Sequence, residues 1–221
     1  MVMRRLILTV VATALVASGC AFFQTQEEKT AQDLASDGME QYENGRYRDA
    51  IKSFENLKDW YPFSNLASLA ELKTADSYYQ LEEYEDAVFA YEEFINLHPR
   101  NEAVPYVIYQ IGRCYYEQIE TIDRDQTASR KALDTFGRLK QQYPDSPYAL
   151  KAEEHIRECL KHLAGYEFNV GLFYYKTKHY RAALHRFMAV LSKYPDVGIQ
   201  HKALEYISLC EESLKSETVE D

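Results

Sequence analysis

Glycine and proline are scarce in this 221-residue chain, with 8 and 6 copies, whereas tyrosine occurs 19 times and phenylalanine 10 times. So few chain breakers argue against short strands joined by tight turns, and against a collagen-like repeat. A hydrophobic content of 46% excludes a disordered chain, and the length is sufficient for a sizeable core. The composition therefore predicts an all-α protein.

An excess of basic residues is also missing. Asp and Glu together number 35 against 25 Lys and Arg, which gives a formal net charge of −10. Nucleic-acid binding requires clustered Lys and Arg, so we expect no nucleic-acid partner. The same sign disfavours adsorption to anionic lipid, so attachment to a membrane must come from another feature of the chain.

The familiar catalytic motifs are missing too: the sequence has no Gly-rich phosphate loop, no Gly-x-Ser-x-Gly elbow and no His-Glu-x-x-His. His155, Cys159 and His162 share one face of a predicted helix, and such a face can hold zinc. Three ligands on one straight helix rarely converge on one ion without a fourth from elsewhere. We therefore expect no catalytic residue, no metal and no cofactor, with a zinc-dependent enzyme as the alternative.

The N-terminus resembles a lipoprotein signal peptide. Arg4 and Arg5 precede an apolar run from Leu6 to Val16, and Ala17-Ser18-Gly19-Cys20 matches a lipobox. The apolar run is too short to span a bilayer comfortably. An ordinary secretory signal or an uncleaved anchor is the alternative.

On this resemblance we expect residues 1–19 to be removed, Cys20 to carry the lipid, and residues 20–30 to form a polar tether. Removal of Arg4 and Arg5 with the signal takes the formal charge from −10 to −12. Residue 21 is Ala and not Asp, and the resemblance therefore implies an outer-membrane location on the periplasmic face. Acyl chains on Cys20 would hold the protein on a bilayer.

Three further cysteines, Cys114, Cys159 and Cys210, lie inside helical patterns. We interpret them as small buried hydrophobic residues. A Cys114–Cys159 disulfide is the alternative, since the predicted compartment is oxidising.

A three-point pattern recurs four times: an Ala, an aromatic residue four positions later and a Pro twelve positions after the Ala. The sets are Ala50, Phe54 and Pro62; Ala87, Tyr91 and Pro99; Ala132, Phe136 and Pro144; and Ala183, Phe187 and Pro195. A small residue precedes each Ala, at Gly38, Ala75, Gly112 and Gly171. Small residues allow two helices to cross closely, the aromatic ring fills the groove beside them, and Pro ends the second helix. This pattern resembles the tetratricopeptide (TPR) consensus and predicts a superhelical solenoid of four helix pairs plus a C-terminal capping helix.

The predicted array covers residues 31–215 and is followed by an acidic tail at 216–221. Its units are 31–62, 65–99, 103–144, 147–195 and 199–215. Unit three has eight extra residues between its helices, around Glu120 to Ala128. Unit four has 14 extra residues, close to four helical turns, so we expect one long helix from about Tyr148 to Lys176.

A tyrosine recurs near the end of four predicted first helices, at Tyr42, Tyr79, Tyr116 and Tyr175. We call these four residues the tyrosine row. Amphipathic rings in a concave groove can stack on apolar side chains and bond to a peptide backbone. Arg113, on the same predicted helix as Tyr116, is placed to meet a carboxylate. Packing between repeats is an equally good interpretation of the row.

The chain as a whole resembles the BamD (ComL) family of outer-membrane β-barrel assembly lipoproteins. The resemblance rests on Trp60-Tyr61-Pro62-Phe63, on Asp123-Arg124-Asp125, on Tyr143-Pro144-Asp145-Ser146-Pro147-Tyr148, and on a long helix containing Tyr166-Glu167 and Tyr174-Tyr175. It implies a non-enzymatic scaffold whose N-terminal repeats recognise unfolded outer-membrane proteins. It also implies that the C-terminal repeats dock the POTRA region of the barrel subunit BamA.

Arg186 matches, by position, an Arg that this family uses toward the barrel subunit. The sequence stops after one helix of unit five, where family members usually have two, and this affects the C-terminal docking surface, including its contacts to other Bam lipoproteins. The alternative function is a TPR lipoprotein scaffold of another complex, such as a pilotin or a coordinator of envelope and peptidoglycan synthesis.

Overall fold

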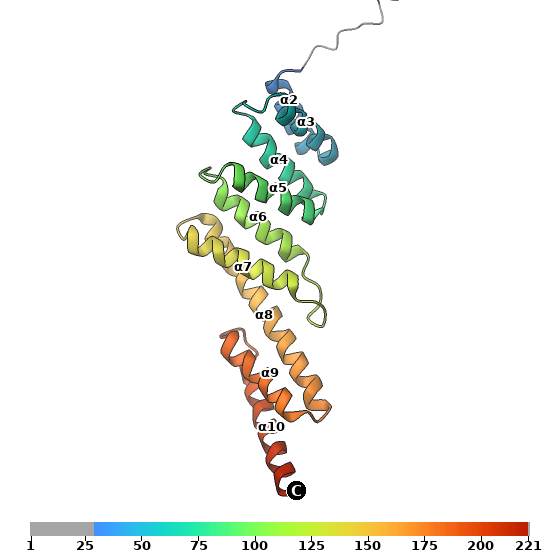
Figure 1. Ribbon diagram of the computed structural model, residues 1–221, viewed down its shortest axis with the longest axis vertical. Coiled ribbons are helices and arrows are strands. Elements are labelled where there is room, and N and C mark those ends of the chain that lie inside the picture. Colours follow the sequence, from blue (N-terminus) through green and yellow to red (C-terminus); the bar gives the residue numbers. More distant parts are fainter. Residues whose placement is uncertain (1–28, 221) are drawn as a thin grey trace, which may run out of the picture.

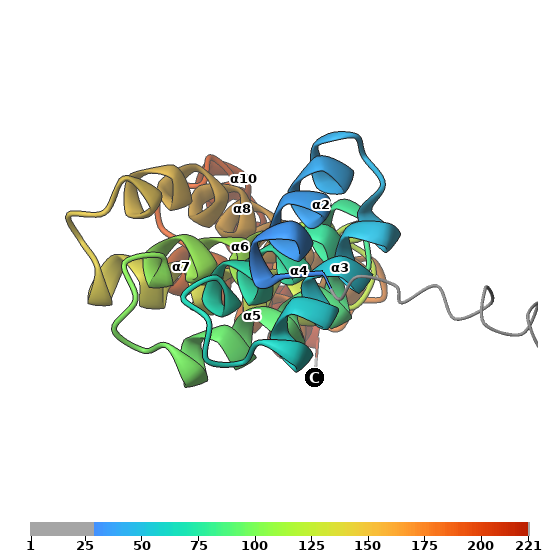
Figure 2. The ribbon, with the colours of Figure 1, turned by 90° about the horizontal axis from the view of Figure 1, so that it is seen from above.

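The computed structural model describes residues 29–220, and the regular structure in this range is entirely helical. Consecutive helices pack against each other along an elongated array (Figure 1). Successive pairs fan around the long axis (Figure 2). The helices are α2 (Ala31–Glu43), α3 (Tyr47–Trp60), α4 (Ala67–Gln80), α5 (Tyr84–Leu97), α6 (Val104–Glu117), α7 (Thr127–Gln142), α8 (Pro147–Lys176), α9 (Tyr180–Lys193) and α10 (Gln200–Glu220). The prediction of an all-α TPR solenoid with four helix pairs and a C-terminal helix is confirmed.

Small residues lie where the two helices of a pair cross, as the repeat predicts. A Cβ added to Gly38 of α2 would lie 2.5 Å from Cε1 of Phe54 of α3, and one added to Gly171 of α8 would lie 2.6 Å from Cε1 of Phe187 of α9. Both rings are fully buried. The helices can therefore approach this closely only because no side chain stands at the glycine positions.

The second helix of each pair ends in the same way, two residues before a proline, with one capping residue between them. The capping residue has φ near −130° and its N–H bonds to the carbonyl oxygen four residues earlier. These residues are Tyr61 (φ −132°), His98 (−128°), Tyr143 (−136°) and Tyr194 (−130°). A residue before proline is pushed out of the helical region, which explains why each helix stops there.

Both predicted insertions are visible in the fold. Helix α8 spans Pro147–Lys176, within one residue of the predicted long helix. The extra residues of unit three form the connection between α6 and α7, and the buried side chain of Gln126 stabilises this connection. Its Nε2 donates to the carbonyl oxygen of Arg124 at 3.0 Å, while its Oε1 lies 3.2 Å from Nδ1 of His162 on α8.

Two predicted boundaries differ from the structure. Helix α10 continues to Glu220, so residues 216–220 extend this helix and do not form a separate tail. After Gly198 the sequence contains neither Gly nor Pro, and Glu, Leu and Lys are good helix formers, so nothing in the sequence interrupts the helix.

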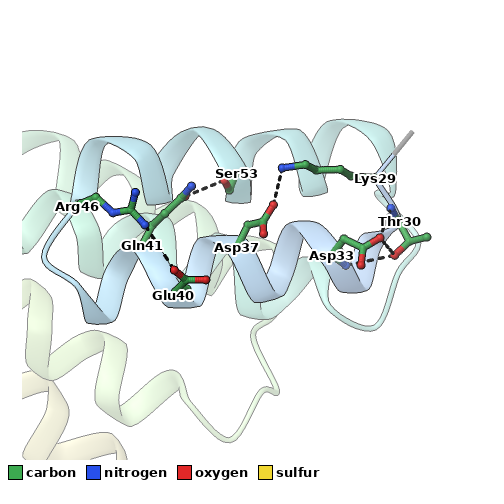
Figure 3. Close-up of polar contacts among 8 residues, drawn as sticks. All are labelled: Lys29, Thr30, Asp33, Asp37, Glu40, Gln41, Arg46 and Ser53. Carbon is green, nitrogen blue, oxygen red and sulfur yellow. Dashed lines mark hydrogen bonds and ion pairs between the residues drawn. The ribbon is translucent and has the colours of Figure 1, made fainter. Parts of the chain in front are cut away.

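The second difference concerns the predicted tether, because its last two residues are packed against α2. Thr30 caps the helix through a reciprocal pair of bonds with Asp33, and Nζ of Lys29 donates to Oδ2 of Asp37 at 2.6 Å (Figure 3). Residues 1–19, Cys20 and the rest of the tether lie outside the described residues. In residues 29–220 no helix has the length and apolar character needed to cross a bilayer.

Candidate functional site

Each member of the tyrosine row lies near the C-terminal end of a first helix. Three of them contact the ring of the tyrosine that opens the next helix. The pairs are Tyr42 with Tyr47, Tyr79 with Tyr84, and Tyr175 with Tyr180, with ring centroids 5.4–5.7 Å apart in edge-to-face geometry. Such pairs add roughly 0.5–1.5 kcal/mol beyond the area that they bury.

Each member also contacts the first helix of the following unit. The contacts are Tyr42 with Lys73, Tyr79 with Arg113, Tyr116 with His155, and Tyr175 with Tyr206, at 4.6–5.3 Å between ring centroids or from the cation to the ring centroid. All four rings stay partly exposed. Packing between repeats is therefore observed. Part of each ring remains exposed to solvent, and binding of a partner in the groove stays a prediction.

Arg113 meets a carboxylate, but on its own helix. Its Nη2 donates to Oε1 of Glu117 at 3.1 Å, and the hydroxyl of Tyr79 donates to the same oxygen at 3.2 Å. Burial raises the pKa of Tyr79, with Arg113 opposing that rise. The guanidinium is thus held between two units, over the face of Tyr79.

The sequence did not predict a buried carboxylate at the centre of units two and three. Oδ1 of Asp76 on α4 accepts from the hydroxyls of Tyr91 on α5 and Tyr106 on α6, at 2.7 and 2.8 Å. Its Oδ2 accepts from Nζ of Lys73 at 2.8 Å, and Gln110 donates to the hydroxyl of Tyr106. We call these residues the Asp76 cluster. Asp76 is only 2% exposed, and burial together with its charge raises the pKa of both tyrosines.

One sign of this cluster was present in the sequence. The aromatic position of the repeat is Phe in units one, three and four but Tyr91 in unit two, and a buried tyrosine hydroxyl requires a partner. The partner was not identifiable from the sequence, because Asp76 lies 15 residues from Tyr91 and 30 residues from Tyr106 along the chain.

A cavity of about 420 Å³ opens beside the cluster, between α4, α6 and α8. Its lining combines apolar, phenolic and charged side chains: Leu72, Lys73, Asp76, Glu102, Ala103, Tyr106 and Tyr148. Ligand pockets typically present mostly apolar walls with a few well-placed polar groups. Two wall residues are held in place by contacts, since the hydroxyl of Tyr106 donates to Asp76 and its ring packs edge-to-face against that of Tyr148 at 5.4 Å.

Arg186 lies in unit four, far along the chain from this cavity. Its Nη1 donates to Oε2 of Glu167 on α8 at 2.9 Å, and Glu167 is only 8% exposed. This bond is the first cause of the raised pKa of Arg186. The guanidinium carries five N–H donors in a fixed plane, so the bond to Glu167 orients the side chain without using all of its donors.

His155, Cys159 and His162 point to different neighbours. The His155 ring stacks on Phe136, with centroids 5.1 Å apart and planes 11° apart, whereas His162 bonds to Gln126. Cys159 is buried, as are Cys114 and Cys210, and none of the three is in a disulfide. Burial raises the pKa of Cys114 and of Cys159 to about 12. Across residues 29–220 no group of three or more His, Cys, Asp or Glu side chains is placed to hold a metal ion.

Residues 27–221 match the family model YfiO, described as an outer membrane lipoprotein. The chain is 30% identical over 203 residues to the outer membrane protein assembly factor BamD of Caulobacter vibrioides, covering 89% of this chain and 67% of that protein. It is 27% identical to BamD of Neisseria meningitidis serogroup A over 229 residues, covering 96% and 85%. Among solved structures it is similar to the TPR2AB-domain:pHSP90-complex of yeast Sti1, with a TM-score of 0.48, 12% identity, and 84% and 71% coverage.

Proposed function

The chain belongs to the YfiO family of outer membrane lipoproteins, and on that premise we propose that it is a non-enzymatic scaffold subunit of the β-barrel assembly machine. In this role Cys20 is lipidated and holds the chain at the periplasmic face of the outer membrane. The array binds unfolded outer-membrane proteins at one end and the POTRA region of BamA at the other. The observation that carries the proposal is the family match over residues 27–221, together with relatives named as assembly factors.

The cavity beside the Asp76 cluster is the site that we assign to the unfolded substrate. Strands of outer-membrane barrels alternate apolar and polar side chains. The cavity offers matching surfaces within one site, with Leu72 and Tyr148 as apolar walls and Lys73 and Glu102 as charged groups. The partly exposed ring of Tyr42 contacts Lys73 of the cavity wall and so extends this surface toward unit one.

Binding of a urea-unfolded outer-membrane barrel protein, diluted into buffer and followed by fluorescence anisotropy, tests this site. Glu102→Trp places a large ring at the cavity wall from an exposed position, and we expect a loss of affinity of about tenfold or more, or about 1.4 kcal/mol. Glu93→Trp, an exposed change on α5 outside the cavity, is the matched control and should bind as the parent does. If both variants bind with equal affinity, the unfolded substrate does not bind in this cavity.

The second half of the proposal places BamA docking at Arg186. Arg186→Gln should weaken binding of a purified POTRA segment, whereas Glu167→Gln should keep it, because the guanidinium remains present in that variant. Arg181→Gln, an exposed change on the same helix, controls for the loss of one positive charge. If Arg186→Gln and Glu167→Gln weaken binding equally, the pair acts by supporting the fold and not by contacting the partner.

A further inference from the structure

Two large apolar side chains protrude from the corner that follows α3. Trp60, the last residue of α3, is 57% exposed, and Phe63 is 101% exposed. The residue between Trp60 and the proline, Tyr61, is instead partly buried against the core of unit one. Exposed Trp and Phe side chains close together form an apolar patch, and such patches on a protein surface often mark contact sites.

The same corner occurs four times in the array, with closely similar backbone angles. This repetition allows the exposed positions two residues before and one residue after the proline to be compared directly. They are Trp60 and Phe63 in unit one, Leu97 and Arg100 in unit two, Gln142 and Asp145 in unit three, and Lys193 and Asp196 in unit four. The backbone turn does not require aromatic residues, since the other corners are polar or charged at one or both positions.

The aromatic corner lies where the described chain begins. The hydroxyl of Tyr61 donates to the carbonyl oxygen of Lys29 at 2.9 Å, and Lys29 is in turn bonded to Asp37 (Figure 3). Figure 1 shows the turn between α3 and α4 beside the start of α2, at the same end of the array. Cys20 is nine residues before Lys29, so it lies within about 32 Å of this point even if the chain is fully extended.

We propose that Trp60 and Phe63 insert into the interfacial region of the bilayer that carries Cys20. The inference rests on the lipid anchor in the proposed function. Tryptophan is enriched at membrane interfaces, and Trp and Phe supply the apolar side of interfacial contacts. An anchor nine residues before Lys29, which contacts Tyr61 of the corner, keeps the corner at high local concentration near the lipid, so a small aromatic patch is sufficient.

Charge identifies the lipid that suits this contact. Once residues 1–19 are removed the formal net charge is −12, so the lipidated chain is repelled by anionic headgroups. The contact therefore depends on apolar insertion and favours a zwitterionic surface. Two attachment points, the acyl chains and the aromatic corner, would also set the direction in which the array leaves the membrane. The substrate cavity would then lie at a fixed distance from the bilayer.

Trp60 is the only tryptophan in the chain, so its fluorescence reports on this corner alone. The lipidated full chain is purified from membranes and reconstituted into phosphatidylcholine vesicles, with and without brominated acyl chains. We expect Trp60 emission to shift to shorter wavelength on reconstitution and to be quenched by the brominated lipid. Phe63→Ser should reduce the quenching, and Phe173→Ser, an exposed aromatic change on α8, should leave it unchanged.

Flotation of the same vesicles separates the two ways of failing. If the chain floats but Trp60 emission stays as in water, the corner does not contact lipid, and the lipid anchor stands. If the chain does not float and carries no acyl group by mass spectrometry, the anchor fails and this inference fails with it. Binding to BamA or to substrate is measured separately and is not affected by either result.

Discussion

Gly112 of α6 faces the ring of Phe136 of α7 so closely that a Cβ at residue 112 would lie 2.5 Å from Cε1 of that ring. Phe136 is fully buried and also stacks on His155 of α8, so one ring joins three helices. The absence of a side chain at Gly112 is therefore a condition for the crossing of α6 and α7, and for the placement of α8 on both.

Gly112→Ala should destabilise the chain despite the higher helix propensity of Ala. Overpacking a core typically costs about 1–3 kcal/mol, against a helix gain of roughly 1 kcal/mol. Gly137→Ala is the matched control on α7, because a Cβ there meets nothing within 4 Å, and it should stabilise by about 0.5–1 kcal/mol. Urea unfolding followed by circular dichroism measures both changes. A stabilising Gly112→Ala would show that the ring can move aside.

Tyr91→Phe should lower the unfolding free energy, although the ring itself fits, as Phe does in the other units. The change removes one of the two hydroxyls that donate to Oδ1 of the buried Asp76. A hydrogen bond to a charged group contributes about 1.5–3 kcal/mol. Tyr84→Phe on the same helix should stay within about 0.5 kcal/mol of the parent in the same urea titration. If the two changes lower the unfolding free energy equally, the Asp76 cluster does not contribute specifically to stability.

Stability should fall as pH drops below about 6.5, the usual pKa of histidine. Burial, and then the charge of Arg113, lowers the pKa of His155, so the unfolded chain binds a proton that the folded chain does not. The unfolding free energy therefore decreases with falling pH from about 6.5 down to the folded pKa. His155→Gln should reduce this decrease, and His201→Gln on α10 controls for loss of an imidazole. An unchanged pH profile for His155→Gln would contradict the assignment.

Cysteine reactivity should be low in the folded chain. Cys114, Cys159 and Cys210 are buried, and burial raises the pKa of each thiol, which keeps it protonated and shielded at pH 8. With Cys20→Ala, a disulfide-exchange reagent should titrate none of the three natively and all of them in denaturant. A missing pair of thiols in denaturant would instead reveal the Cys114–Cys159 disulfide.

The repeat pattern was sufficient to predict the architecture because it records local geometry. The spacing from Ala50 to Pro62 sets the length of the second helix, and Gly38 opposite Phe54 sets the crossing. The extra residues before Gly171 correspond to nearly whole turns, so α8 could be predicted as one helix. None of these inferences required knowledge of contacts between distant units.

The polar interior was harder to predict, since it depends on contacts between three helices. No motif in the sequence singles out Asp76, and only the folded chain brings Tyr91 and Tyr106 to it. Each member of the tyrosine row lies on a first helix, but its contacts between repeats are visible only in the assembled array. Its role toward a partner remains a prediction.

The most direct test of the proposed function is purification of the tagged chain, with its signal peptide intact, from membranes of its native host. Mass spectrometry of the co-purified proteins, with Arg186→Gln and Arg181→Gln run in parallel, gives the readout. We predict a POTRA-containing barrel protein that is depleted by Arg186→Gln and retained by Arg181→Gln. Recovery of pilus, secretion or peptidoglycan-synthesis proteins in its place would keep the fold and contradict the assembly role.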